Sequence, residues 1–150
     1  MNFASKLLIF ITLIIFSISS TSSLAKRAAI IIDYDTKEVL FEINADTLNY
    51  PASLVKIMTL YILFDYLEKN KIQMNTKMKV SAVAASRSSS KLYLEEGSTI
   101  SVEDAMMALI IKSANDVATV IAEHISGTER DFSKLMTKCA KEIGMTKTTY

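Results

Sequence analysis

The chain has 150 residues, enough for one domain of ordinary size but short for two, and half of its residues are apolar. Three glycines, one proline and no tryptophan exclude a disordered or collagenous chain, and a net charge of +1 gives no electrostatic reason to bind nucleic acid. One cysteine, Cys139, and one histidine, His124, exclude an internal disulfide and the common zinc sites. We therefore expect no metal and no cofactor, and we expect any catalysis to use Ser, Lys, Asp, Glu or Tyr side chains.

Residues 1–25 have the layout of a secretory signal peptide. A basic start ending at Lys6 precedes an apolar run over 7–18, and small residues end the segment at Ala25. The run is shorter than the roughly 20 apolar residues that a membrane-spanning helix needs, although an uncleaved membrane anchor is the alternative. Removing the segment takes away one basic residue and no acid, so we expect a neutral, exported chain.

The exported chain begins with a predicted hairpin. Strands are expected over 28–34 and 38–43, joined by a turn at 35–37. Pro51 then precedes a run over 52–64 that has helical length, contains no glycine and is apolar on every face. Such a helix is typical of the centre of a protein, where it needs cover on all sides.

The second half of the chain is predicted to be mainly helical. A short strand over 77–81 and a turn at 95–97 come first, and Glu95 and Glu96 belong to a solvated turn. Ser101 and Thr128 each precede an acid by three positions, which is a helix-start signature. The helices are therefore expected from Ser101 to about Ile111, from Asp116 to Ser126 with Gly127 as its end, and from Thr128 to Gly144.

Several single residues of these helices have structural interpretations. We expect Met106 and Met107 to fill the core and Cys139 to be a small buried residue. His124 is expected to be partly buried and not catalytic.

Ser53 and Lys56 form the first candidate site. They stand three positions apart at the start of the apolar helix, which sets both side chains on one face. A lysine in apolar surroundings tends to lose its proton, and a neutral lysine can accept the proton of a serine hydroxyl. Two other S-x-x-K strings are weaker, because the one at 23–26 crosses the expected cleavage site and the one at 88–91 lies in a polar serine run. The alternative is that Lys56 extends to water as an ordinary surface lysine.

Ser113 and Asn115 form the second candidate site, in the only S-x-N string of the chain. The string lies at a break between two predicted helices, which suits a tight loop that holds polar groups toward a cleft. The alternative is that Asn115 only caps the helix that begins at Asp116.

Together these strings resemble the penicillin-recognising serine enzymes, which carry S-x-x-K, then S-x-N, then K-T-G. The sequence is most similar to D-alanyl-D-alanine carboxypeptidases of the low-molecular-mass penicillin-binding type. The strings P-A-S-L-V-K-I-M-T at 51–59 and S-A-N-D at 113–116 carry this similarity, which runs from about Ala28 to Tyr150. It implies an α/β fold of the penicillin-binding and β-lactamase-like transpeptidase type. Residues 26–150 would be the N-terminal portion of the catalytic domain, with a strand hairpin of the central sheet and a helical lobe.

The resemblance also implies a role for each candidate residue. Ser53 is the nucleophile that takes up the acyl group of a peptidoglycan stem peptide ending in D-Ala-D-Ala, and its backbone N–H forms half of the oxyanion hole. Lys56 is the general base, Ser113 relays the proton to the leaving D-alanine, and Asn115 holds the substrate amide. A β-lactam antibiotic acylates the same serine, and the compartment is the periplasm.

The sequence departs from this family in one respect, because it contains no K-T-G. The nearest string, Lys147-Thr148-Thr149, comes too soon after Asn115 and ends in threonine. In the family this motif lies on a strand that supplies the second oxyanion N–H and a lysine for the terminal carboxylate. We therefore expect the remaining sheet strands to be missing and the reading frame to be truncated or split. Without those strands, one side of the apolar helix after Pro51 should be exposed. The alternatives to a carboxypeptidase are an inactive exported remnant and, with less support, a β-lactamase-like hydrolase.

The export signal makes a prediction about the mature N-terminus. Because small residues end the segment at Ala25, the exported protein should begin at Lys26. N-terminal sequencing of protein recovered from the periplasm checks this. An intact Met1 on membrane-associated protein would instead support the uncleaved anchor.

Overall fold

The structure is a computed structural model that describes residues 27–150, so the predicted signal peptide lies outside the described residues. The described residues divide into two compact units, with the boundary between Asn49 and Tyr50. We refer to them as the hairpin unit and the helical unit. Within residues 27–150, no helix is long and apolar enough to cross a membrane.

The hairpin unit contains strands β1 (Ala29–Ile32) and β2 (Val39–Ile43), which pair antiparallel as predicted. Asp33 organises the turn, because its Oδ1 accepts a hydrogen bond of 2.8 Å from the backbone N–H of Thr36. Hydrogen bonds from the backbone and side chain of Thr36 lower the pKa of Asp33, since they favour its charged form. Every residue of both strands is exposed, and two strands alone are marginal in water.

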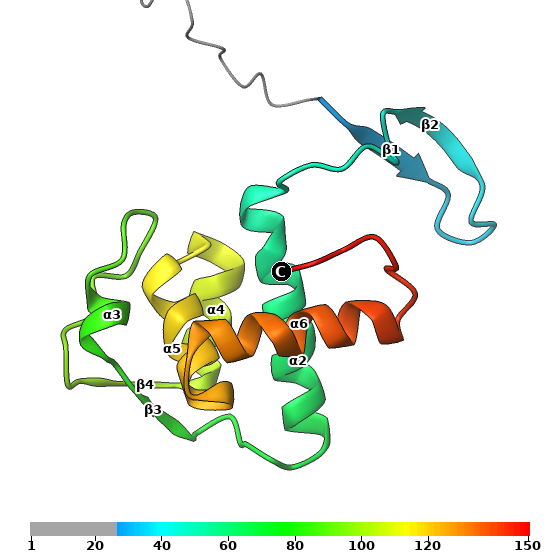
Figure 1. The fold of residues 1–150 in the computed structure, drawn as a ribbon. Coiled ribbons are helices and arrows are strands. Elements are labelled where there is room, and N and C mark those ends of the chain that lie inside the picture. Colours follow the sequence, from blue (N-terminus) through cyan, green and yellow to red (C-terminus); the bar gives the residue numbers. More distant parts are fainter. Residues whose placement is uncertain (1–26) are drawn as a thin grey trace, which may run out of the picture. The chain divides into compact units, whose positions relative to one another are not determined.

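The helical unit holds the remaining elements (Figure 1). In chain order they are the 3₁₀ turn η1 (Ala52–Leu54), α2 (Val55–Glu68), β3 (Lys77–Lys79), α3 (Ala82–Ala85), β4 (Thr99–Ser101), α4 (Val102–Lys112), α5 (Asn115–Ser126) and α6 (Glu129–Glu142). Strands β3 and β4 pair antiparallel in a sheet of their own. The order of elements agrees with the prediction, except that α3 and β4 were not expected.

Helix α5, and not α2, is the central element of the helical unit. It packs against α2, α3, α4, α6 and β3, and it buries six residues. The helix after Pro51 is exposed on one side in the described residues, as predicted. Helix α2 buries only Met58, Thr59, Ile62 and Leu63. Its opposite face is exposed at Ile57, Tyr61 and Phe64.

The predicted helix starts are confirmed by side-chain caps. The Oγ of Ser101 accepts from the backbone N–H of Asp104 at 3.1 Å, and Thr128 Oγ1 accepts from that of Asp131 at 3.0 Å. Gly127 follows α5 with φ of 79°, a conformation that favours glycine. Because such caps satisfy otherwise unpaired backbone N–H groups within one turn, sequence spacing alone was enough to find them.

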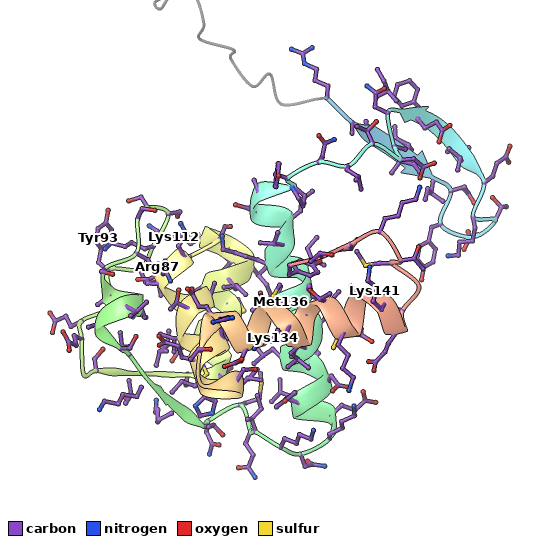
Figure 2. All side chains as sticks on the ribbon, in the orientation of Figure 1. Arg87, Tyr93, Lys112, Lys134, Met136 and Lys141 are labelled. Atoms are coloured by element: carbon purple, nitrogen blue, oxygen red, sulfur yellow. The ribbon has the colours of Figure 1, made fainter. Side chains whose placement is uncertain are left out.

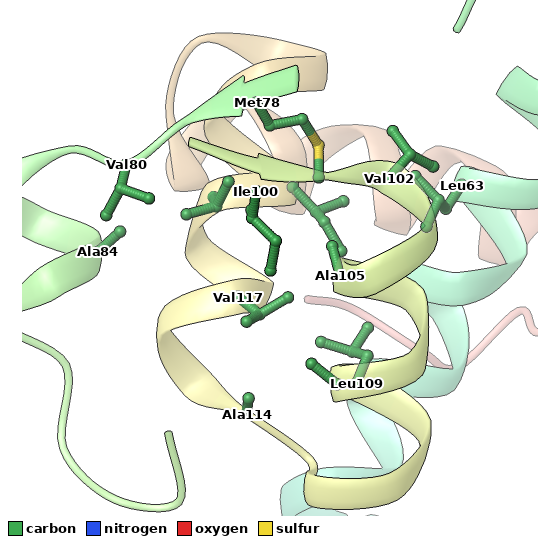
Figure 3. Packing of buried hydrophobic residues seen from close by; sticks show 13 residues of the cluster. Leu63, Met78, Val80, Ala84, Ile100, Val102, Ala105, Leu109, Ala114 and Val117 are labelled. Carbon is green, nitrogen blue, oxygen red and sulfur yellow. The ribbon is translucent and has the colours of Figure 1, made fainter. Parts of the chain in front are cut away.

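Two apolar clusters form the core of the helical unit. The larger lies between the β3–β4 sheet, α4 and α5, where Met78, Ile100 and Val117 meet (Figure 3). The smaller joins α2 to α6 through residues such as Ile62 and Met136. Helix α6 is accordingly two-sided, because Met136 is buried while Lys134 and Lys141 are exposed (Figure 2).

Three single-residue expectations need correction. Met107 is exposed, and only its neighbour Met106 packs against the core. His124 is exposed as well. Cys139 is half-buried at the edge of the smaller cluster, where partial burial raises the pKa of its thiol.

The two faces of α2 give a stability prediction. Leu63 is fully buried, so Leu63→Ala should lower the free energy of unfolding by about 2–5 kcal/mol. Ile57 on the same helix is 63% exposed, and Ile57→Ala should change it by about 0.5 kcal/mol or less. Urea unfolding of both variants measures the difference. Equal destabilisation would show that the outer face of α2 is covered in solution.

Candidate active site

Ser53 and Lys56 lie on either side of a change in helix type. Ser53 is the middle residue of the 3₁₀ turn η1, and Lys56 is the second residue of α2. Ala52, just before Ser53, has φ of 48° in the left-handed region, which a residue with a Cβ seldom adopts. The serine therefore belongs to a tight, strained turn and not to a regular α-helix as expected. Its side chain is exposed, whereas Lys56 is half-buried.

Lys56 reaches the second predicted site. Its Nζ donates a hydrogen bond of 2.8 Å to Oδ1 of Asn115, 59 positions later in the chain. Burial lowers the pKa of Lys56, since the charged amine loses contact with water. Lys56 is therefore not the fully solvated surface lysine of the alternative interpretation, and its amine is biased toward the neutral, proton-accepting form.

The Asn115 side chain does not cap its own helix, which was the alternative for the S-x-N string. Ala114 occupies the N-cap position of α5, and no side-chain hydrogen bond caps the helix. The Nδ2 of Asn115 instead donates to the backbone carbonyl of Ser88 at 3.0 Å. Its backbone N–H donates to the carbonyl of Ser90 at 2.7 Å. The asparagine amide is thus held between a lysine donor and a backbone acceptor, which fixes its orientation.

Ser113 ends α4 in a left-handed conformation, with φ of 54°. Its Oγ is buried and has no hydrogen-bond partner within the described residues. A buried hydroxyl without a partner is uncommon in folded proteins, and a catalytic role is one of the explanations for it. Of the four predicted site residues, the structure joins Lys56 and Asn115 directly by a hydrogen bond. Along the chain, Ser53 lies three positions before Lys56, and Ser113 lies two positions before Asn115.

Lys56 and Asn115 line a pocket of about 350 Å³ between α2, α5, α6 and the segment after α3. Its lining combines polar and apolar side chains. The lining residues are Val55, Lys56, Thr59, Arg87, Ser88, Asn115, Ala118, Thr119, Ala122, Glu129, Phe132 and Met136.

A polar network on this pocket was not found by sequence reasoning. Arg87, labelled in Figure 2, forms an ion pair with Glu129, and its Nε donates to Oγ1 of Thr119 at 3.0 Å. The Thr119 hydroxyl in turn donates to Oε1 of Glu129 at 2.6 Å. These residues come from the segment after α3, from α5 and from α6, and no local pattern connects them. In residues 27–150 no cluster of three or more His, Cys, Asp or Glu side chains could hold a metal ion.

Comparisons with known proteins give the family of this chain. The sequence matches the D-alanyl-D-alanine carboxypeptidase family over residues 16–150. It is 40% identical over 132 residues to D-alanyl-D-alanine carboxypeptidase DacF of Bacillus subtilis. The aligned stretch covers 87% of this chain and 34% of DacF. The chain spans about a third of the length of the curated relatives it matches.

Solved structures agree with the sequence match. The D-alanyl-D-alanine carboxypeptidase DacD from Francisella tularensis aligns with a TM-score of 0.79 and 36% identity, covering 82% of this chain and 30% of that one. Penicillin-binding protein D2 from Listeria monocytogenes, in its cefotaxime-bound form, aligns with a TM-score of 0.72 and 32% identity, covering 82% of this chain and 49% of that one.

The fold is therefore that of the penicillin-binding and β-lactamase-like proteins, as the sequence motifs predicted. The chain belongs to the D-alanyl-D-alanine carboxypeptidase family.

The lowered pKa of Lys56 can be measured directly. Its amine should titrate at lower pH than the amine of Lys69, the C-cap residue of α2, whose pKa is raised by a hydrogen bond to Asp65. Because the folded pKa of Lys56 lies below the unfolded one, its contribution to stability should grow as pH rises from the folded to the unfolded value. NMR titration of ¹³Cε-labelled lysines checks the order. A Lys56 that titrates with or above Lys69 would contradict it.

Proposed function

We propose that this protein is a serine-type D-Ala-D-Ala carboxypeptidase, which removes the terminal D-alanine from peptidoglycan stem peptides through an acyl-enzyme on Ser53. The supporting observation is the hydrogen bond from Lys56 to Asn115, which links the S-x-x-K string to the S-x-N string beside a pocket. Family membership gives the reaction class, since the relatives are named D-alanyl-D-alanine carboxypeptidases. Structural neighbours carry the same name.

The first step is attack on the peptide carbonyl. Ser53 Oγ bonds to the carbonyl carbon between the two D-alanines, and the serine proton passes to Lys56. A lysine serves as this base only when its amine is neutral, and the partial burial of Lys56 favours that form. The Asn115 carbonyl accepts a hydrogen bond from the Lys56 amine, so it orients the amine without taking its lone pair.

The second step breaks the peptide bond. The leaving D-alanine nitrogen takes a proton, which Ser113 relays from Lys56, and the acyl group stays on Ser53. The partnerless Ser113 hydroxyl is free for this relay. Water then adds to the ester carbonyl, the bond to Oγ breaks, and Ser53 regains its proton. The products are the shortened peptide and D-alanine.

The same serine would be the target of β-lactam antibiotics. The Listeria relative has been crystallised in ampicillin-bound and cefotaxime-bound forms. We assign the protein to the periplasm, because residues 1–25 have the layout of a signal peptide and because its proposed substrate lies outside the inner membrane.

The acyl-enzyme can be located by labelling. Incubation with a fluorescent penicillin, followed by proteolysis and peptide mapping, should place the adduct on Ser53. Lys56→Ala should slow labelling by about 100-fold or more, since general-base catalysis contributes roughly 10²–10⁴ in rate.

Two matched variants act as controls. Ser133→Ala on α6 and Lys69→Ala at the end of α2 lie outside the pocket lining and should label at the unsubstituted rate. An adduct on Ser88, which begins the other S-x-x-K string in the exported chain, would overturn the assignment. So would full labelling of Lys56→Ala.

A further inference from the structure

Asp116 follows directly after Asn115, and its carboxylate is fully buried. Both of its oxygens accept from the backbone N–H of Leu92, at 3.0 and 3.1 Å. Oδ2 also accepts from the N–H of Leu94 at 3.1 Å, and Oδ1 accepts from the N–H of Val117 at 2.9 Å. The carboxylate therefore ties the first turn of α5 to the segment 88–94, which we call the front loop.

This arrangement compensates a charge that is expensive to bury. A buried carboxylate needs either a cation or several hydrogen bonds. No lysine or arginine is among the hydrogen-bond or ion-pair partners of Asp116 in residues 27–150. Backbone N–H groups stabilise the carboxylate instead, and the N-terminal end of α5 adds a favourable electrostatic field. Two of the three backbone donors belong to the front loop, so the loop must stay in place for the charge to be tolerated.

The front loop has a shape that needs such an anchor. Tyr93 lies between the two bound amides and has φ of 62°, an unusual conformation for an aromatic residue. Its side chain is 69% exposed, so packing of the ring does not fix it. The Asp116 carboxylate holds the residues on both sides of Tyr93 and thereby over-determines the strained backbone.

The other end of the front loop contacts the candidate active site. The Ser88 carbonyl accepts from Nδ2 of Asn115, and the Ser90 carbonyl accepts from its backbone N–H. The Ser88 carbonyl can accept only from the NH₂ side of the amide, which turns Oδ1 of Asn115 toward Lys56. If the amide were reversed, the Lys56 amine would face Nδ2 of Asn115, which is itself a hydrogen-bond donor.

We propose that Asp116 is a positioning residue for the acylation step: its buried carboxylate fixes the front loop, the Ser88 carbonyl then fixes the Asn115 amide, and the amide orients Lys56. This inference rests on the proposed function only for its consequence in catalysis. The chain of contacts from Asp116 to Asn115 is testable without any substrate.

The test uses Asp116→Asn in the full chain. The change keeps the size of the side chain but replaces one acceptor oxygen with a donor that faces backbone N–H groups. Hydrogen exchange by NMR should become at least about 10-fold faster at the amides of Leu92 and Leu94 and at the side-chain amide of Asn115. The rate of acylation by a penicillin should fall at least about 10-fold, while the dissociation constant of the non-covalent complex changes less than about two-fold.

Two further variants keep the test decisive. Ile62→Val weakens the other apolar cluster and should leave the Asn115 signal and the acylation rate unchanged, which separates positioning from general destabilisation. Ser90→Ala releases the front loop at its other tether, because Ser90 Oγ donates to the Lys112 carbonyl at 2.8 Å. If Asp116→Asn does not fold, Ser90→Ala should still accelerate exchange at the Asn115 side chain.

The outcomes distinguish the two proposals. If the Asn115 side chain exchanges at the unsubstituted rate in both Asp116→Asn and Ser90→Ala, the positioning role is wrong. Faster exchange with an unchanged acylation rate also overturns it. If the exchange results hold but the unsubstituted chain forms no adduct on Ser53, the proposed function fails and the structural link from Asp116 to Asn115 stands.

Discussion

The burial of α5 is the constraint on which the rest of the helical unit depends. The helix packs against α2, α3, α4, α6 and β3. A helix surrounded by other elements in this way is expected to be apolar. Its first turn instead carries Asn115 and Asp116, with Thr119 one turn later. Each of these polar side chains needs partners in the interior, and each finds them in a segment distant in sequence. Their partners define where α2, the front loop and α6 lie around the pocket.

The local features of this fold could be predicted because they depend on neighbouring residues. The caps at Ser101 and Thr128 and the turn at Asp33 each join groups two or three positions apart. The composition of the chain did not show which helix is central. The composition of α2 is more apolar than that of α5, yet α2 exposes Ile57 and Phe64. Which apolar face is covered depends on tertiary contacts that composition does not encode.

The sequence predicted the side chains of the candidate site, but it did not predict the backbone groups that orient them. The S-x-x-K and S-x-N strings led to Lys56 and Asn115, which the structure joins. The Ser88 carbonyl that orients Asn115 has no sequence signature, because every residue carries a carbonyl. In the sequence, Asp116 was the predicted start of a helix and the last residue of the S-A-N-D string, and neither indicated its contacts with Leu92 and Leu94. The three-residue strand β4 was missed for a related reason, since its pairing with β3 is long-range.

The ion pair between Arg87 and Glu129 makes one wall of the pocket sensitive to ionic strength. Both side chains are more than a third exposed, so dissolved salt screens their attraction. The Thr119 hydroxyl bonds to both partners and is buried. These two hydrogen bonds involve the charged guanidinium and carboxylate groups, but at a buried hydroxyl they are screened less than the exposed ion pair. Added salt should therefore weaken the ion pair first, while the Thr119 hydroxyl still connects the segment after α3 to α5.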